Sequence, residues 1–464
     1  MVGINRQTQY KSILIKNAHI ITVDKKDRII KDGAIFVKND RIVDIGKSDD
    51  LLPKYKAEKI IDARQNLVIP GLINTHSHMV YYLTRGLGMD KHTIDWLRAT
   101  IWPFMSELSE DDAYIGALLG YVENLKTGTT FVIDNNTCQR KDRKGIIDRV
   151  AQASLESGIK TILLRGYHDE PSKIPEIFVE SLDEINHEYE RIIEKWHNKG
   201  NGRIKTWIHP ANLLYCSLES LCKFNELAKK HDIGIHTHVA EDREGTNRIK
   251  ERYGKGYVEV FHDIGVLGPK FQMAHTIFVS EKEIQYIAQA QARVMYTPTA
   301  DMLLAAGAAP IHKMRDAGVV VGLGTDSPNN SQDMIQCMKF GALLLKATTE
   351  NSTIMPAYEI LQIATINGAK SMGLENEIGS LEVGKKADIV IVGVHKLHTT
   401  PLHDPISTLV YSSSGTDVDT VIVDGEVLVE GGKLVHINES EIMEKAQEAA
   451  DGVIKRCKSQ LNRK

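Results

Sequence analysis

The sequence predicts an α/β protein that consists of a (β/α)8 TIM-like barrel and a small β-sandwich domain formed by both chain ends. Two observations carry this prediction. Residues 71–326 alternate eight short apolar segments with helical patterns, and Ile- and Val-rich segments separated by turns bracket that region. In addition, a chain of 464 residues is long enough for one large domain and a smaller one.

The two chain ends predict the smaller domain. Asp424-Gly425, between the apolar segments VIV and EVLV, is a strong hairpin signal. We therefore expect residues 1–69 and 386–464 to form one composite β domain, which ends in a helix from about Glu439 to Lys458. The Ile- and Val-rich segments on which this expectation rests are 13–23, 33–46, 59–69, 387–393 and 419–437.

The middle of the chain, residues 70–385, predicts the barrel. Helical patterns such as 110–128 and 281–292 separate the apolar segments, and eight such βα units favour a closed barrel over an open sheet. The expected strands are 71–78, 129–135, 160–166, 203–210, 233–238, 271–275, 293–298 and 319–326.

Charge, hydropathy and cysteine usage exclude several classes of function. The net charge is −4 and no large basic cluster occurs, so we expect no nucleic-acid partner. No apolar run approaches the ~20 residues of a membrane span, and the polar N-terminus lacks a signal-peptide core. The five cysteines are scattered and form no CxxC pair, which is typical of reduced thiols. These features predict a cytoplasmic protein.

Five residues that suit a metal site stand at the ends of four expected strands. His76 and His78 end the first strand, His238 the fifth, His275 the sixth and Asp326 the eighth. In a barrel of this kind the functional residues gather at the C-terminal strand ends, and strand residues i and i+2 share a face. Each residue alone is typical of an ordinary hydrogen-bonded polar side chain. Together they indicate a divalent-metal site with one coordination place left for water.

Two neighbouring observations refine this hypothesis. Glu241 lies three residues beyond His238 in HTHVAED, where a carboxyl group can act as acid or base; taken alone, it would be a first-turn helix glutamate. Lys205 stands well before the end of the fourth expected strand, so we find no rim lysine that could bridge two metals. We expect one divalent ion per chain, zinc, with iron as the alternative. His236 lies one layer deeper than His238 and is expected to pack behind the site.

These motifs carry a family resemblance. PGLINTHSH, HTHVAE, AH at 274–275, GLGTDSP and IGSLEVGKKADIVIV together resemble the amidohydrolase superfamily over about residues 12–455. The branch that the chain is similar to holds triazine hydrolases, guanine and cytosine deaminases, and methylthioadenosine/S-adenosylhomocysteine deaminases. This resemblance implies a (β/α)8 barrel with a β-sandwich made from both chain ends, in agreement with the patterns above.

The resemblance also implies roles for individual residues. Segments 94–103 and 129–136 look similar to triazine hydrolases, which implies that Trp96 and Asn135 approach the substrate. Ser327 and Asn330 follow Asp326 at the place where a leaving group would be sensed. The implied metal ligands are His76, His78, His238 and Asp326, and the implied catalytic residues are Glu241, His275 and Asp326.

One departure from the family pattern bears on the substrate. Adenosine-type deaminases of this branch have a glutamate that binds ribose hydroxyls, and this chain has Met105 near that place. Their Ser-Asn pair after the seventh strand is altered here to Ala300-Asp301. We therefore expect a free heteroaromatic ring in preference to a nucleoside.

The expected function is hydrolytic deamination of a nitrogen heteroaromatic ring, of purine, pyrimidine, pterin or triazine type, through a metal-activated water. The alternatives are dechlorination or dealkylamination of an s-triazine, and deamination of methylthioadenosine or S-adenosylhomocysteine. A non-catalytic structural relative is disfavoured because no expected ligand is lost. The expected partners are a small heteroaromatic substrate and other copies of the chain in a homo-oligomer.

Overall fold

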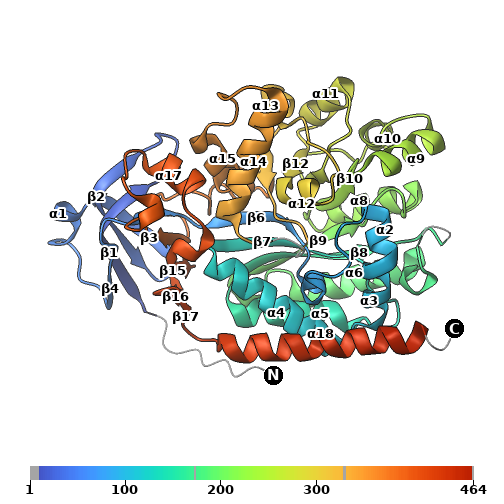
Figure 1. Cartoon of the computed structure of the whole chain (residues 1–464), viewed down its shortest axis with the longest axis horizontal. Helices are drawn as coiled ribbons and strands as arrows, with labels where there is room; N and C mark the ends of the chain where they lie inside the picture. Colours follow the sequence, from blue (N-terminus) through green and yellow to red (C-terminus); the bar gives the residue numbers. More distant parts are fainter. Residues whose placement is uncertain (1–9, 172–173, 328–330, 462–464) are drawn as a thin grey trace. The chain divides into compact units, whose positions relative to one another are not determined.

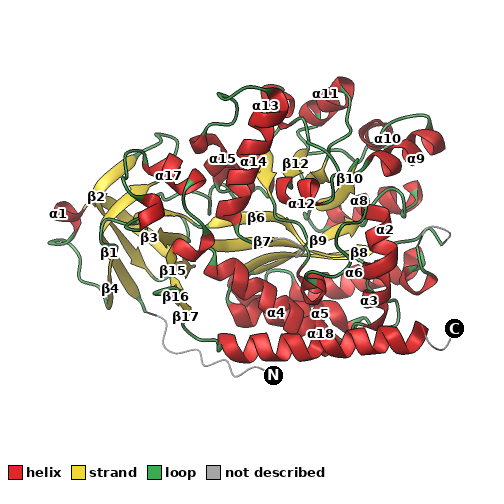
Figure 2. Ribbon diagram, viewed as in Figure 1, coloured by secondary structure: helices red, strands yellow, loops and turns green. Residues whose placement is uncertain are grey.

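The computed structural model describes residues 10–171, 174–327 and 331–461 (Figures 1 and 2). The chain divides into two compact units, which are taken one at a time. The first unit comprises, in its described part, residues 10–74, 122–131 and 332–439. The second unit comprises, in its described part, residues 75–121, 132–327 without 172–173, residue 331 and residues 440–461.

The first unit holds a nine-stranded sheet built from both chain ends. Strand β14 pairs antiparallel with β5, with Ile389 opposite Pro70, and so joins the C-terminal strands to the N-terminal ones. The strand order is β17-β16-β15-β14-β5-β1-β2-β3, and β4 pairs with β1. The strands are β1 (Ser12–Ile21), β2 (Ile29–Lys38), β3 (Arg41–Lys47), β4 (Lys59–Asp62), β5 (Leu67–Pro70), β14 (Ile389–Val392), β15 (Val418–Val423), β16 (Glu426–Glu430) and β17 (Lys433–Leu434).

This sheet confirms that the two chain ends form one β domain. Buried isoleucines and valines of β1, β2 and β14 form its apolar core, as the alternating sequence pattern predicts. Asp424 and Gly425 both have positive φ in the turn between β15 and β16, which is the conformation that a two-residue hairpin requires. The predicted limits after residues 69 and 385 fall where the chain changes sheets, and as domain boundaries they stay a prediction.

The second sheet is the predicted barrel. Its eight strands are ordered as in the chain, from β6 to β13, and all eight expected strands are present. Strands β8 and β9 are covered on the outside by helices α5 (Gly145–Ser157), α6 (Leu182–Trp196) and α8 (Leu218–Lys230) (Figure 2). The strands are β6 (Leu72–Ser77), β7 (Thr129–Asn136), β8 (Lys160–Tyr167), β9 (Ile204–Pro210), β10 (Ile235–Val239), β11 (Phe271–His275), β12 (Arg293–Tyr296) and β13 (Val321–Leu323).

The barrel closes between its first and last strands. Ser77 forms a parallel bridge with Asp326, and the N–H of Asp326 donates to the carbonyl oxygen of His76 at 2.8 Å. Gly324 makes this approach feasible, because a Cβ there would lie 2.7 Å from Cβ and 2.8 Å from the backbone nitrogen of His76. Closure therefore places the end of β13 directly against the predicted ligand His76.

The helices follow the strands as the sequence predicts. The expected helices at 110–128, 281–292 and 439–458 correspond to α4, α11 and α18. No helix in the described ranges is both long and apolar enough to cross a membrane. The longer helices are α4 (Glu110–Lys126), α5 (Gly145–Ser157), α6 (Leu182–Trp196), α8 (Leu218–Lys230), α9 (Arg243–Tyr253), α10 (Tyr257–Asp263), α11 (Glu281–Gln289), α14 (Met334–Thr349), α15 (Ala357–Ile363), α17 (Pro405–Tyr411) and α18 (Glu439–Leu461).

Shorter helical segments follow β6 and β12, at the end of the barrel where the strand-end histidines lie. Between β6 and α4 the chain forms η1, α2, η2 and α3, of which η2 is a π-helical turn. Such turns are frequent at functional sites. These segments are η1 (Met79–Thr84), α2 (Thr93–Trp96), η2 (Leu97–Ile101), α3 (Trp102–Glu107) and α12 (Pro298–Leu303).

Candidate active site

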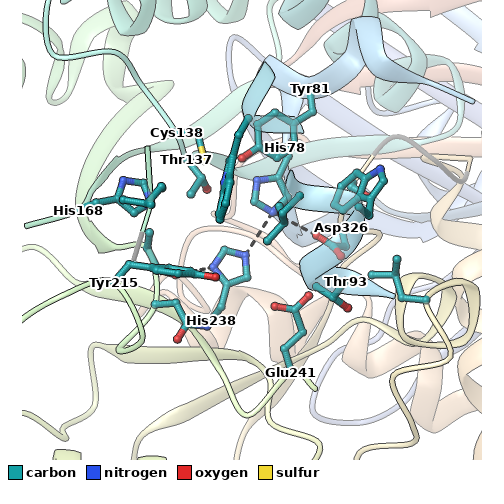
Figure 3. A pocket seen from close by; sticks show the side chains of 18 residues that line it. His78, Tyr81, Thr93, Thr137, Cys138, His168, Tyr215, His238, Glu241 and Asp326 are labelled. Atoms are coloured by element: carbon teal, nitrogen blue, oxygen red, sulfur yellow. Dashed lines mark hydrogen bonds and ion pairs between the residues drawn. The ribbon is translucent and has the colours of Figure 1, made fainter. Parts of the chain in front are cut away.

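Four side chains from three strand ends converge at one end of the barrel. Nε2 of His76 and Nε2 of His78 lie 3.2 and 3.1 Å from Oδ1 of Asp326. Nε2 of His238, from β10, lies 3.3 Å from Nε2 of His78. Figure 3 shows the side chains of His78, His238 and Asp326 pointing toward one another. The structure thus brings together all four residues that the sequence predicts as metal ligands.

The donor set fits a divalent metal ion. Ligand atoms about 2.0–2.2 Å from a tetrahedral zinc ion lie roughly 3.3–3.6 Å apart, and the distances here are 3.1–3.3 Å. Three imidazoles and one carboxylate are also the ligand types that zinc and iron accept. Among the described residues, ligand atoms of His76, His78 and Asp326 form one group compact enough for an ion, and those of His76, His238 and His275 form another.

Backbone and side-chain contacts orient the histidines from behind. Nδ1 of His78 donates to the carbonyl oxygen of Asn135 at 2.8 Å, and Nδ1 of His238 donates to the carbonyl oxygen of Ala211 at 2.7 Å. Nδ1 of His76 lies 2.8 Å from Nε2 of His236. These contacts leave each Nε2 directed at the cluster, which is how metal-binding histidines are usually held. His236 lies beneath the site, as its place in the sequence suggests.

His275 joins the cluster from the end of β11. Its Nδ1 lies 2.9 Å from Oδ1 of the fully buried Asp301, and Thr297 Oγ1 lies 2.9 Å from the same nitrogen. Burial lowers the pKa of His275, but the carboxylates of Glu241, Asp301 and Asp326 outweigh burial and raise the pKa to about 10. Ring stacking with His238 fixes its position, with centroids 5.5 Å apart.

Two of these strand ends have unusual backbone conformations. His275 and Asp326 both have φ of +65°, a region that side-chain-bearing residues seldom adopt. The chain turns sharply after each strand, so both side chains face the same end of the barrel. Backbone strain at positive φ persists only where the surrounding fold holds it in place, and such residues are found mainly at functional sites.

Glu241 lies beside the cluster, just past β10. Removal from bulk water raises the pKa of its carboxyl group to about 7, with an opposing contribution from His275 and a further one from Asp326. A carboxyl group with a pKa near neutrality can both give and take a proton at physiological pH. Figure 3 shows the Glu241 carboxyl group directed toward the side of the pocket where Asp326 lies.

A pocket opens onto these residues. Its metal-site end is formed by His78, His238, Glu241 and Asp326, and the remaining wall is largely aromatic and aliphatic. Such a combination of an apolar wall and a few convergent polar groups is typical of a small-molecule site. The other lining residues are Tyr81, Thr93, Trp96, Leu97, Trp102, Thr137, Cys138, His168, Ile174, Ala211, Asn212, Tyr215, Leu304 and Ser327.

The four predicted substrate contacts fall in different places. Trp96 and Ser327 line the pocket. Asn135 lies behind the histidines, where its Nδ2 donates to the carbonyl oxygen of Ser77 at 3.0 Å. Asn330 lies outside the described residues. Trp96 and Ser327 thus border the cavity and Asn135 lies beneath the site, and their contacts with a substrate stay predictions.

Sequence reasoning missed several wall residues. His168 directly follows β8, and Tyr215 lies between β9 and α8. The sequence did contain a signal for His168, because it stands at the C-terminal end of the third barrel strand. Polar residues at that end of a strand are candidates for the functional site, as His238 is. Tyr215 and Cys138 come from connecting segments, and no strand-end rule points to them.

Comparison with known proteins agrees with this architecture. The family model described as "Amidohydrolase family" matches residues 67–428. The chain is 38% identical over 448 residues to a 5′-deoxyadenosine deaminase of Methanosarcina acetivorans, covering 96% of this chain and 99% of the relative. It is 36% identical over 451 residues to a 5-methylthioadenosine/S-adenosylhomocysteine deaminase of Thermoanaerobacter pseudethanolicus, covering 96% and 100%.

A solved structure gives the same result in three dimensions. An adenosine deaminase from Xanthomonas campestris, crystallised with bound zinc, superimposes with a TM-score of 0.89 at 25% identity and covers 96% of this chain and 98% of its own. The family model and the sequence relatives agree on a hydrolase, and the donor set together with the zinc-bound structural neighbour supports a divalent metal ion. The chain belongs to the amidohydrolase family.

Proposed function

We propose that the protein deaminates the adenine ring of an adenosine derivative that is modified at its 5′ position. The observation that carries this proposal is the placement of Glu241, with a pKa near 7, in the same pocket wall as His78, His238 and Asp326. Relatives that match nearly the whole chain are named as deaminases of 5′-deoxyadenosine and of 5-methylthioadenosine or S-adenosylhomocysteine, and these names support the choice of ring.

The sequence argument for a free ring rests on Met105 and Asp301, and neither residue is among the described residues that line the cavity. Met105 is fully buried in α3 and is not among the described residues that line the pocket. Asp301 is fully buried as well, and its carboxylate contacts His275. Neither departure from the family pattern therefore removes a group from the pocket wall, so we propose a nucleoside in place of the free ring expected from the sequence.

The proposed metal content is one zinc ion per chain, held by His76, His78, His238 and Asp326. When bound, a divalent ion of this kind activates water for attack at neutral pH. The argument against a second ion is that Lys205 lies at the beginning of β9, where its Nζ is 3.1 Å from Oδ1 of Asn198 at the surface. It is thus remote from the end of the strand at which a bridging lysine would be needed.

The side chains then divide the proton transfers. Glu241, protonated near pH 7, gives its proton to the ring nitrogen next to the amino-bearing carbon, which drains charge from the ring. Asp326 accepts a proton from the attacking water and later passes it to the departing ammonia; burial opposes its ionisation, but His76 and His78 hold its pKa well below the usual range. His275 hydrogen-bonds the attacking oxygen and stabilises the tetrahedral adduct.

The remaining predicted residues have supporting roles in this proposal. Trp96 packs against the substrate, and Ser327 lies beside Asp326 where ammonia departs. Asn135 holds the backbone that carries His76 and His78, so we propose a positioning role for it. Assembly into a homo-oligomer and a cytoplasmic location stay predictions.

Ammonia release from purified protein tests the proposal. The substrate panel contains 5′-deoxyadenosine, methylthioadenosine, S-adenosylhomocysteine, adenosine, adenine, guanine, cytosine and a chlorinated triazine, with chloride release measured for the last. We expect the highest kcat/KM with a 5′-modified adenosine and about one equivalent of zinc per chain. Activity confined to free bases or to the triazine would contradict the proposed substrate, and two tightly bound ions would contradict the proposed metal count.

A further inference from the structure

His168 is a buried polar residue of the pocket wall that the proton transfers above do not use. It directly follows β8, is 1% exposed and lines the pocket. Figure 3 shows it on the opposite side of the drawn side chains from Asp326. A substrate whose reacting carbon lies at the metal site would therefore direct its far end toward His168.

His168 stands in an aromatic part of the wall. Its ring lies edge-on to Tyr215 with centroids 6.0 Å apart, and Tyr215 is in turn edge-on to Trp102 at 6.4 Å. Nδ1 of His168 is buried and has no hydrogen-bond partner among the described residues. A buried polar atom without a partner is destabilising, so such an atom calls for a ligand or an ordered water.

Two other polar groups of the same wall already have partners, whereas Nε1 of Trp96 is buried without one among the described residues. Oδ1 of Asn212 accepts from the hydroxyl of Tyr257 at 2.9 Å, and Oγ1 of Thr137 lies 3.3 Å from Nε2 of His209. These contacts fix the wall without a substrate. His168 differs from Asn212 and Thr137, because its Nδ1 is buried without a hydrogen-bond partner among the described residues.

The chemistry of His168 limits the kind of ligand that it can bind. Burial, with a smaller contribution from Arg165, lowers its pKa to about 3, so the imidazole is neutral and offers one donor and one acceptor. Arg165 itself is paired with the buried Glu180 at 2.5 Å, so its charge is neutralised. A neutral hydroxyl group, which can also donate and accept, matches this site better than a charged group does.

We propose that His168 is a specificity-determining residue that hydrogen-bonds a ribose hydroxyl of the substrate. The inference rests on the proposed function, a purine nucleoside with its amino-bearing carbon at the metal site. In 5′-deoxyadenosine and methylthioadenosine the 5′ carbon carries hydrogen or sulfur, so the 2′- and 3′-hydroxyls are the sugar hydroxyls that these compounds share. His168 thus recognises the 2′,3′-diol and separates nucleosides from free bases.

A comparison of two substrates in the wild type and in a His168 variant tests this role. Adenosine and 2′,3′-dideoxyadenosine differ only in the diol, and His168→Phe removes both ring nitrogens but keeps an aromatic ring. We expect the variant to lose about tenfold in kcat/KM with adenosine, near the upper end of what one neutral hydrogen bond contributes. With the dideoxy compound we expect a loss of less than about twofold, because the partner is already missing.

Ile174→Val is the matched control, since Ile174 lines the same pocket and has no polar side-chain atom. It should change kcat/KM for both substrates by the same factor. His168→Gln keeps a neutral donor and acceptor, and it should retain more of the preference for adenosine than His168→Phe does. If the phenylalanine variant does not fold, His168→Leu replaces it, because leucine also removes both ring nitrogens. An unchanged preference of His168→Leu for adenosine over the dideoxy compound overturns the role.

Three outcomes separate this inference from the proposed function. Wild-type protein that deaminates adenosine, together with a His168→Phe variant whose preference for the diol is unchanged, overturns the inference alone. Equal losses on both substrates also overturn it, since they indicate a purely structural role. Wild-type protein that releases ammonia from neither nucleoside nor from 5′-deoxyadenosine contradicts the proposed function, and the inference fails with it. If 5′-deoxyadenosine is turned over and adenosine is not, the same comparison is made with 5′-deoxyadenosine and its 2′,3′-dideoxy analogue.

Discussion

Replacement of Gly324 by alanine should disrupt the metal site without changing a ligand. The new Cβ would lie 2.7 Å from Cβ, 2.8 Å from the backbone nitrogen and 2.9 Å from the carbonyl oxygen of His76. Ordinary contact at such a position begins at 3.4 Å, so the two strands must separate by about 0.7 Å. Two of the three atoms belong to the backbone, and no side-chain rotation can relieve the contact.

This displacement acts directly on the ligands. His76 belongs to β6 and Asp326 follows β13, and their ligand atoms are 3.2 Å apart. Metal–ligand distances tolerate about ±0.2 Å, so a shift of about 0.7 Å exceeds the tolerance several-fold. We expect zinc affinity to fall about 10–100-fold, as it does when supporting contacts of a metal site are lost, and the free energy of unfolding to fall by about 1–3 kcal/mol.

The assay is zinc content by mass spectrometry after dialysis against buffered metal, together with kcat on a 5′-modified adenosine. Gly268→Ala is the matched control, because a Cβ at Gly268 meets nothing within 4 Å and its φ is not positive. It should bind zinc and turn over substrate like the wild type. Full zinc occupancy and unchanged kcat in Gly324→Ala would refute the argument that close strand contact sets the ligand geometry.

Three further predictions concern the catalytic groups. Glu241→Gln should keep the metal but lower kcat about 10²–10⁴-fold, since it removes a general acid; near-normal turnover with full zinc would contradict its role. Because desolvation raises the pKa of Glu241 to about 7, its acidic form is present below that pH and lost above it. The kcat of the wild type should therefore decline as pH rises through about 7, and a flat profile from pH 6 to 9 would exclude Glu241 as the titrating acid. Asp301→Ala should destabilise the protein by about 3–5 kcal/mol in urea unfolding, because it leaves His275 buried without its carboxylate partner. Asp301→Asn should cost less, and equal losses in the two variants would mean that the charge of Asp301 is immaterial.

The barrel and the ligand cluster could be predicted because both depend on local signals. Parallel strands repeat one apolar pattern, and their C-terminal ends meet at one end of the barrel. His76 and His78 could therefore be placed beside His238 without any knowledge of loops. His236 could be placed one layer below His238, because alternate residues of a strand share a face and lie at successive depths in the barrel. Its contact with His76 agrees with that placement.

The pocket wall could not be predicted in this way. Tyr215 and Cys138 reach the pocket from connecting segments, whose paths depend on packing that no short motif encodes. Asn135 shows a second limit, because a residue at a strand end can face the cavity or support its neighbours from behind. Here it does the latter, through Ser77 and His78. Met105 is buried and is not among the described residues that line the pocket, so it bears on the substrate only indirectly.

The segment between β6 and α4 has a consequence for engineering. Residues 79–107 supply five wall residues, namely Tyr81, Thr93, Trp96, Leu97 and Trp102, whereas the predicted metal ligands all lie outside this range. Part of the pocket wall and the predicted metal ligands thus occupy separate stretches of chain. A chimera that receives residues 79–107 from another member of the family should shift substrate preference and keep its zinc. Few positions would then need redesign to obtain a new deaminase from this barrel.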